Sequence, residues 1–177
     1  MPSDNPLLLD ACVLINLEAT DRLDSLARTL GLDLLVPEPV CAEVGGLRAK
    51  VDGVCQIVPI RLDHHVSQGT LTVTALKPEE LSTYVELARD LGDGEASVIA
   101  VAESRGLAIA TDDRKARRIS IEHGLPEPLR TTRILHDYCD RCDSSIIRDI
   151  LWAVEQRANY IPARSDPDRD WWRKHLE

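Results

Sequence analysis

Five acidic residues are the groups in this sequence most able to do chemistry. Asp10 closes the apolar run Leu7 to Leu9, and Asp112 and Asp113 close the run Leu107 to Ala110. The carboxyl ends of parallel strands share one edge of a sheet, where open α/β sheets bind ligands. Carboxylates gathered there repel one another unless a cation lies among them, and hard oxygen ligands suit Mg²⁺ or Mn²⁺. The pattern indicates a metal-dependent phosphodiesterase, with the candidate catalytic and metal-binding residues Asp10, Glu43, Glu95, Asp112 and Asp113.

The first of the elements that must position these acids are two helices after Asp10, over residues 12–19 and 21–30, followed by a short strand over residues 32–36. Pro37 and Pro39 are tolerated in the first turn of a helix. That helix would carry Glu43, turned inward, and would end at Gly45 and Gly46.

A second set of elements carries the other acids. Glu95 begins a helix that runs to Arg105, ends at Gly106 and leads into the strand 107–110. A further helix covers residues 114–123. Strands alternating with helices in this order predict an α/β fold with three α/β/α layers and a central parallel sheet.

The remaining segments are less regular. Residues 51–76 are rich in β-branched residues and punctuated by glycine, which predicts short strands or a hairpin. Residues 144–160 form an amphipathic helix, and its apolar stripe should pack on the body of the protein or on a second subunit. The polar tail 162–177 contains Trp171 and Trp172, which we expect to dock on the same chain. The C-terminal part is therefore a helical extension.

Composition limits the class of protein. A chain of 177 residues fits one domain with a core of its own. The absence of a signal sequence or a membrane-spanning run predicts a cytoplasmic protein without membrane contact. Five cysteines are an odd number, scattered along the chain, and are expected to be reduced. The net charge of −9 argues against broad binding of nucleic acid, although the basic run 114–118 can still contact phosphates.

Three motifs in order along the chain resemble the PIN-domain family. They are Leu9-Asp10-Ala11-Cys12 with Asn16 and Glu43 downstream, Gly92-Asp93-Gly94-Glu95-Ala96, and Ala110-Thr111-Asp112-Asp113-Arg114. That family contains metal-dependent ribonucleases, among them the VapC-like toxins of bacterial toxin–antitoxin pairs. The resemblance covers about residues 5–135. It implies a nuclease domain over residues 1–140, with the helix and tail of residues 141–177 belonging to the same domain.

The resemblance also implies roles for individual residues. Asp10 is similar to the first metal ligand of the family, Glu43 to the second acid on a helix and Glu95 to the third. The fourth acid is Asp112 or Asp113. Asn16 and Thr111 match polar positions that support the acids. An endoribonuclease of this kind uses Mg²⁺ or Mn²⁺ and RNA as substrate, and an antitoxin protein and a second copy of the chain are candidate partners.

Two other functions compete with this interpretation. A catalytically weak PIN-like module would bind a partner protein and would have no need of four acids at one edge. A zinc-stabilised interaction domain would use His136, Cys139 and Cys142, but a fourth ligand at suitable spacing is missing. The pair His64 and His65 is expected on a surface loop.

Overall fold

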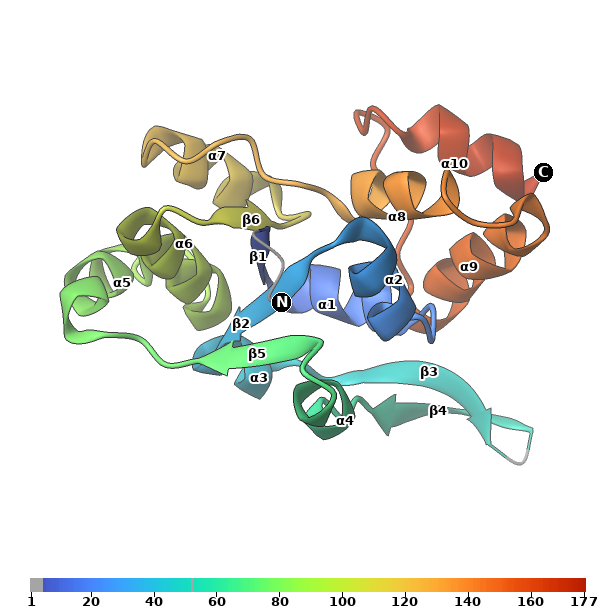
Figure 1. The fold of residues 1–177 in the computed structure, drawn as a ribbon, viewed down its shortest axis with the longest axis horizontal. Helices are drawn as coiled ribbons and strands as arrows, with labels where there is room; N and C mark the ends of the chain where they lie inside the picture. The colour runs from blue at the N-terminus through green and yellow to red at the C-terminus, as the bar shows by residue number, and fades with distance from the viewer. Residues whose placement is uncertain (1–4, 52) are drawn as a thin grey trace.

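Four parallel strands form the central sheet of the protein. The computed structural model describes residues 5–51 and 53–177. The strands lie in the order β5-β2-β1-β6, and Leu7 of β1 pairs with Leu34 on one side and with Ala108 on the other. Helices cover both faces of the sheet (Figure 1), so the predicted three-layer α/β/α fold is confirmed. The strands are β1 (Pro6–Leu9), β2 (Asp33–Pro37), β5 (Leu71–Thr74) and β6 (Ala108–Ala110).

Helices from distant parts of the chain make up the two outer layers. Helices α5, α6 and α7 lie on one side of the sheet, and α1, α2 and the C-terminal helices lie on the other (Figure 1). Helix α6 begins two residues before Glu95, because Gly92 serves as its N-cap. The bounds are α1 (Ala11–Glu18), α2 (Leu23–Leu30), α3 (Glu38–Glu43), a 3₁₀ turn η1 (Pro78–Glu80), α5 (Leu81–Leu87), α6 (Asp93–Arg105) and α7 (Arg114–Glu122).

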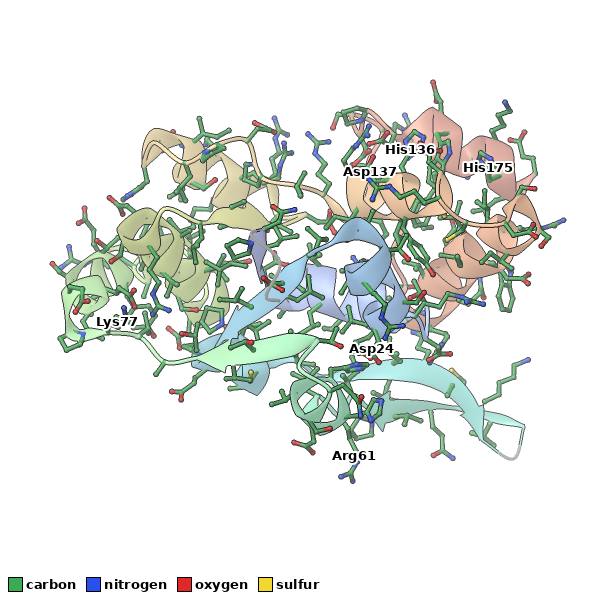
Figure 2. All side chains as sticks on the ribbon, in the orientation of Figure 1. Asp24, Arg61, Lys77, His136, Asp137 and His175 are labelled. Atoms are coloured by element: carbon green, nitrogen blue, oxygen red, sulfur yellow. The ribbon has the colours of Figure 1, made fainter. Side chains whose placement is uncertain are left out.

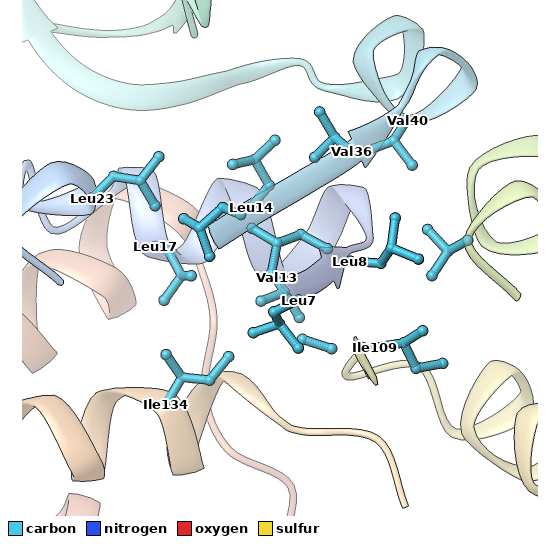
Figure 3. Close-up of a cluster of buried hydrophobic side chains, with 14 of the residues drawn as sticks. Leu7, Leu8, Val13, Leu14, Leu17, Leu23, Val36, Val40, Ile109 and Ile134 are labelled. Atoms are coloured by element: carbon cyan, nitrogen blue, oxygen red, sulfur yellow. The ribbon is translucent and has the colours of Figure 1, made fainter. Parts of the chain in front are cut away.

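The hydrophobic core is centred on β1 and α1. Leu7, Leu8 and Leu9 are all buried, as expected for a parallel strand that is covered on both faces. Leu14 and Leu17 of α1 are also buried and belong to the same cluster, part of which is drawn in Figure 3. Each fully buried side chain of this size contributes roughly 1.5–3 kcal/mol. The core therefore fixes the end of β1, where Asp10 follows.

The segment over residues 51–76 contains more than the predicted hairpin. An antiparallel hairpin of β3 (Gly46–Val51) and β4 (Val54–Pro59) begins five residues earlier than expected. The last strand, β5, joins the parallel sheet. Helix α4 (Asp63–Ser67) lies between them and carries His64 and His65, so the expected surface loop is wrong. His65 lies 2.9 Å from Glu18 and 2.8 Å from Asp24, which is labelled in Figure 2.

The C-terminal part is folded onto the body. The predicted helix 144–160 is divided into three segments, and its apolar residues Ile147, Ile150, Leu151 and Val154 are buried in the same chain. Helix α8, which the sequence pattern did not predict, precedes them. None of the described helices is both long and apolar enough to cross a membrane. The segments are α8 (Thr131–Cys139), a 3₁₀ turn η2 (Ser144–Ile146), α9 (Ile147–Ala153), a π-helical turn η3 (Val154–Ala158) and α10 (Arg169–Leu176).

Aromatic contacts hold the tail in place. Trp172 of α10 is fully buried, and its Nε1 donates a hydrogen bond of 2.9 Å to Glu155 Oε1. Trp171 stacks on His136 of α8, which is labelled in Figure 2, with ring centroids 4.2 Å apart. His136 also contacts Asp168 through Nδ1, at 2.7 Å. The expected docking of the two tryptophans on the same chain is confirmed, but the polar tail itself is helical.

Candidate active site at the carboxyl edge of the sheet

The ends of β1 and β6 place Asp10 and Asp112 next to each other. Leu9 pairs with Ala110, and each acid follows its strand within two residues. The backbone amide of Asp10 donates to Ala110 O at 3.1 Å, and the amide of Thr111 donates to Leu129 O at 3.0 Å. Backbone hydrogen bonds thus hold both strand ends in register.

Asp10 is a buried carboxylate that is only half satisfied. It is 2% exposed and is the N-cap of α1, with Oδ1 accepting from the Val13 amide at 2.7 Å. Its Oδ2 has no partner at hydrogen-bond geometry within the described residues, although the nearby Thr111 side chain favours the ionised form. Burial raises the pKa of Asp10 to about 7, opposed by Thr111 and the Val13 amide, and the charges of Asp112 and Glu95 raise it further. An unpaired buried carboxylate oxygen is costly, so this atom needs a partner.

Asp112 is held by four hydrogen bonds. Its Oδ1 accepts from the Thr131 amide at 3.0 Å and from the Tyr160 hydroxyl at 3.3 Å. Its Oδ2 accepts from Thr131 Oγ1 at 2.5 Å and from Asn16 Nδ2 at 3.1 Å. Burial raises the pKa of Asp112, and these donors offset part of the rise because they favour the ionised form. The orientation of the carboxylate is therefore fixed by residues from α1, from α8 and from the segment after η3.

Asp113 and Glu95 also stabilise the starts of the helices α7 and α6. Asp113 is the N-cap of α7, with Oδ1 accepting from the Ala116 amide at 2.7 Å. Glu95 is half-buried in the first turn of α6, where its Oε2 accepts from the Gly92 amide at 2.9 Å. Both residues also border the same cavity as Asp112. Each side chain keeps one carboxylate oxygen outside these capping bonds.

A cavity of about 400 Å³ is bordered by Glu95, Asp112 and Asp113, whereas the buried Asp10 is not among the residues that line it. Cys12 stands at its edge, and its pKa is raised to about 12 by loss of hydration and then by the charges of Asp10, Asp112, Glu95 and Asp113. Cys12 therefore lies within range of the charges of all four acids. The raised pKa keeps Cys12 protonated and unreactive at neutral pH. The cavity is lined by Cys12, Ile15, Asn16, Glu95, Asp112, Asp113, Ala158, Asn159 and Tyr160.

Glu43 differs from the prediction. It is the last residue of α3 and is exposed, so the expected inward orientation is wrong. Its Oε1 accepts a hydrogen bond of 2.7 Å from the Gly94 amide, at the start of α6. Glu43 is absent from the residues that line the cavity. Glu43 and Glu95 therefore both bind backbone amides at the start of α6, and Glu43 lies outside the cavity.

The donor set suits a hard divalent cation. Within residues 5–51 and 53–177, no three His, Cys, Asp or Glu side chains are grouped closely enough to hold one metal ion. Mg²⁺ usually needs only one or two protein carboxylates, because it keeps several of its water ligands. The unpaired Oδ2 of Asp10, next to the charges of Asp112 and Glu95, fits that mode of binding. His136, Cys139 and Cys142 form no such group either, and His136 is occupied by Asp168 and Trp171.

Comparison with known families agrees with this arrangement. The sequence model of a family described as a PIN domain matches residues 6–160. The chain belongs to the PIN-domain family. The PIN domain is typically a nuclease fold. The resemblance seen in the three sequence motifs is thus confirmed, and the match extends beyond them to the segment that contains Tyr160.

Two solved structures are similar to this PIN domain. One is a PilT N-terminus domain protein, SSO1118, from the hyperthermophilic archaeon Sulfolobus solfataricus P2, with 12% identity, a TM-score of 0.47, and coverage of 78% of this chain and 97% of that chain. The other is PAE2754 from Pyrobaculum aerophilum, with 22% identity, a TM-score of 0.47, and coverage of 77% and 98%. No curated protein matches the chain.

Two residues of this PIN domain's site were missed from the sequence. Thr131 and Tyr160 both donate to Asp112, yet they lie 19 and 48 residues beyond it. The Thr131-Thr132 pair at the start of a helical pattern was an available signal for a polar helix terminus. Tyr160 offered no signal, because a single tyrosine after an amphipathic helix fits equally well in a core or on a surface.

Proposed function

We propose that the protein is a metal-dependent endoribonuclease that hydrolyses RNA phosphodiester bonds. The observation that carries this proposal is Asp10, a buried carboxylate that has one unpaired oxygen and lies within range of the charges of Asp112 and Glu95. Asp10 and Asp112 follow strands of a fold that is typically a nuclease fold. Carboxylates gathered in this way favour a divalent cation over a neutral ligand. An RNA substrate would place the protein in the cytoplasm.

Each acid has a proposed role at this edge. Asp10, Glu95 and Asp112 would hold Mg²⁺ or Mn²⁺ directly or through water. When bound, the ion would activate a water for in-line attack and neutralise charge on the phosphate, leaving 5′-phosphate and 3′-hydroxyl ends. Of the adjacent pair, Asp112 is the stronger candidate ligand, because its charge acts on Asp10 and that of Asp113 is not among the causes of the raised Asp10 pKa. Glu43 would act mainly by holding the start of α6, which carries Glu95.

The test is cleavage of a mixed RNA pool with Mg²⁺ or Mn²⁺. Wild type should cleave, whereas Asp10→Asn and wild type with EDTA should not. Asp149→Asn is the matched control, since Asp149 is an exposed acid on α9, outside the cavity lining. Cleavage that survives both EDTA and Asp10→Asn would refute the proposal.

A second candidate function is binding of a partner protein, such as the antitoxin that a toxin role requires. The observation that favours it is β4, an uncharged edge strand in which Val54 is 60% exposed and Ile57 is 62% exposed. Beside the hairpin lies a groove of about 590 Å³ that contains Arg48, Lys50 and Arg157. Exposed apolar residues next to cations suit an acidic segment that adds a strand to β4.

This second function can be tested without knowing the partner. The probe is a fluorescent peptide of alternating glutamate and valine. It should bind wild type and lose affinity with Arg48→Glu or Ile57→Lys, while metal-dependent cleavage is retained. If the peptide does not bind and light scattering shows a dimer that Ile57→Lys dissociates, the occupant of β4 is a second copy of the chain instead.

A further inference from the structure

A second hollow adjoins the acidic cavity and has the opposite character. Its volume is about 510 Å³, and it shares Asp112 and Tyr160 with the acidic cavity as a common wall. Arg114 and Arg117 enter it from the first turns of α7, three residues apart and hence on one face of the helix. Arg130 enters from the residue before α8. Three guanidinium groups therefore converge in a chain whose net charge is −9.

The arginines are only partly neutralised by the protein. Arg130 lies 3.4 Å from Asp166, and Arg117 pairs with the exposed Glu127. The Nε of Arg117 is buried and has no hydrogen-bond partner within the described residues. Arg114 is exposed and forms no ion pair in the part of the chain that the structure describes. Arg114 thus gives the hollow an uncompensated cation, and the buried Nε of Arg117 becomes available to a ligand after the side chain moves.

Two acids also line the hollow and offset part of this charge. Asp166 pairs with Arg130 and accepts two hydrogen bonds from Thr132 Oγ1, at 2.9 and 3.0 Å. Asp112 accepts its four hydrogen bonds from neutral donors, so it remains negative when it is ionised. The lining therefore has three guanidinium groups against two carboxylates. The excess positive charge lies beside the site where a phosphodiester would be cleaved.

We propose that this arginine hollow binds a backbone phosphate of single-stranded RNA next to the phosphate that is cleaved. Guanidinium forks match phosphate oxygens in pairs, and a phosphate would satisfy the Nε of Arg117. Ile161, 60% exposed at the same hollow, supplies an apolar contact for the sugar or base. A recessed site is reached by a flexible single strand more readily than by a duplex. This inference rests on the proposed ribonuclease function.

The test is binding rather than cleavage. Anisotropy of a short fluorescent single-stranded RNA of mixed sequence is measured in EDTA, which prevents hydrolysis and leaves the acidic cavity the same in every variant. Arg114→Gln and Arg117→Gln should each weaken binding by roughly 5-fold to 10-fold, and should lower the slope of log Kd against log salt by about 0.7.

Arg118→Gln is the matched control. Arg118 is on the same helix, but it pairs with Glu122 and borders a different hollow. It should bind RNA as wild type does. If Arg114→Gln and Arg117→Gln bind RNA as tightly as Arg118→Gln, the subsite is refuted. Because Arg114 is exposed, its variant reports on binding even if Arg117→Gln folds poorly.

Two further outcomes separate this inference from the function on which it rests. RNA binding that depends on Arg114, in a protein that shows no metal-dependent cleavage, would refute the hydrolysis and keep the phosphate subsite. Metal-dependent cleavage with unchanged RNA binding in both arginine variants would refute the phosphate subsite and keep the hydrolysis. A polyglutamate peptide that requires the same arginines, while RNA binding does not, would assign the hollow to an acidic protein.

Discussion

At the scale of single residues, the main feature is the free-energy cost of burying the ionised side chain of Asp10. Its pKa in the folded chain is about 7, against an ordinary value of 3.8. The folded state therefore binds a proton more tightly than the unfolded state does. Protonated Asp10 therefore stabilises the folded state, fully below about pH 4, and this stabilisation is lost as the pH rises to 7. At neutral pH the ionised carboxylate opposes folding.

Asp10→Asn should therefore stabilise the metal-free protein above pH 7, by up to about 4 kcal/mol. Asparagine is as good an N-cap for α1 as aspartate, so the helix start is retained. At pH 4 the difference should vanish. The measurement is urea unfolding at both pH values in EDTA. Added Mg²⁺ should stabilise wild type alone, and an equal Mg²⁺ effect on the variant would contradict the assignment of Asp10.

Tyr160 provides a second prediction at this scale. Tyr160→Phe removes one donor from Asp112 and keeps the ring that packs edge-on against Trp172. Loss of a donor to the ionised form raises the pKa of Asp112 still further. We expect kcat to fall roughly 5-fold, as for one lost hydrogen bond of about 1 kcal/mol, and the acid limb of the pH–rate profile to move to higher pH.

The matched control for Tyr160 is Tyr84→Phe. The Tyr84 hydroxyl donates to Asp93, which is absent from the cavity lining. The substitution Tyr84→Phe therefore removes the same kind of hydrogen bond from an acid that has no role in the proposed mechanism. An identical pH–rate profile for wild type and Tyr160→Phe would show that Tyr160 is structural only.

At the scale of elements, the start of α6 joins two of the predicted acids. The Gly92 amide is bound by Glu95 and the Gly94 amide by Glu43. Both carboxylates also complement the positive end of the helix dipole. This terminus therefore explains why two glycines flank Asp93 in the sequence motif: Glu43 lies close to the helix start.

Gly94→Ala should disrupt this arrangement. A Cβ at Gly94 would lie 2.2 Å from Glu43 Oε2, so the Glu43 carboxylate must move away from the start of α6. We expect at least a 10-fold loss of cleavage, with a modest loss of stability of about 1 kcal/mol. Gly45→Ala is the control, since a Cβ there meets nothing within 4 Å. Full activity of Gly94→Ala would remove Glu43 from the proposed site.

At the scale of the whole molecule, α10 links the end of the described chain to the site. Trp172→Ala should cost about 3–5 kcal/mol, because the indole is fully buried. It should also lower cleavage, since Tyr160 loses its aromatic neighbour. Trp152→Ala, at a tryptophan that is 56% exposed, should change stability by less than about 1 kcal/mol. Chemical unfolding of both variants checks this.

The parallel sheet and the acids at its edge could be predicted from sequence, because each depends on local patterns. The run Leu7 to Leu9 is apolar because β1 is covered on both faces. An acid that follows such a strand lies at the carboxyl edge of the sheet. The same locality allowed α1, α2 and α7 to be predicted within two residues.

The remaining features depend on contacts between distant residues. The exposure of Glu43 follows from its bond to Gly94, 51 residues away. The helix α10 has a polar sequence, and its docking depends on Glu155 and His136 as partners. His65 lies on the short helix α4, and its partners Glu18 and Asp24 are 41 residues or more away in the sequence. Spacing along the chain carries no information about such partners.

The hydrogen bond from Tyr160 to Asp112 has a consequence for biosynthesis. A ribosome makes the acids first, and domains begin to fold from the N-terminal side during translation. The segment that carries Tyr160 emerges only after residues 10 to 131 have been made, so the nascent chain holds Asp112 without its last donor. We therefore expect full activity toward RNA to appear only after Tyr160 has left the ribosome and can donate to Asp112.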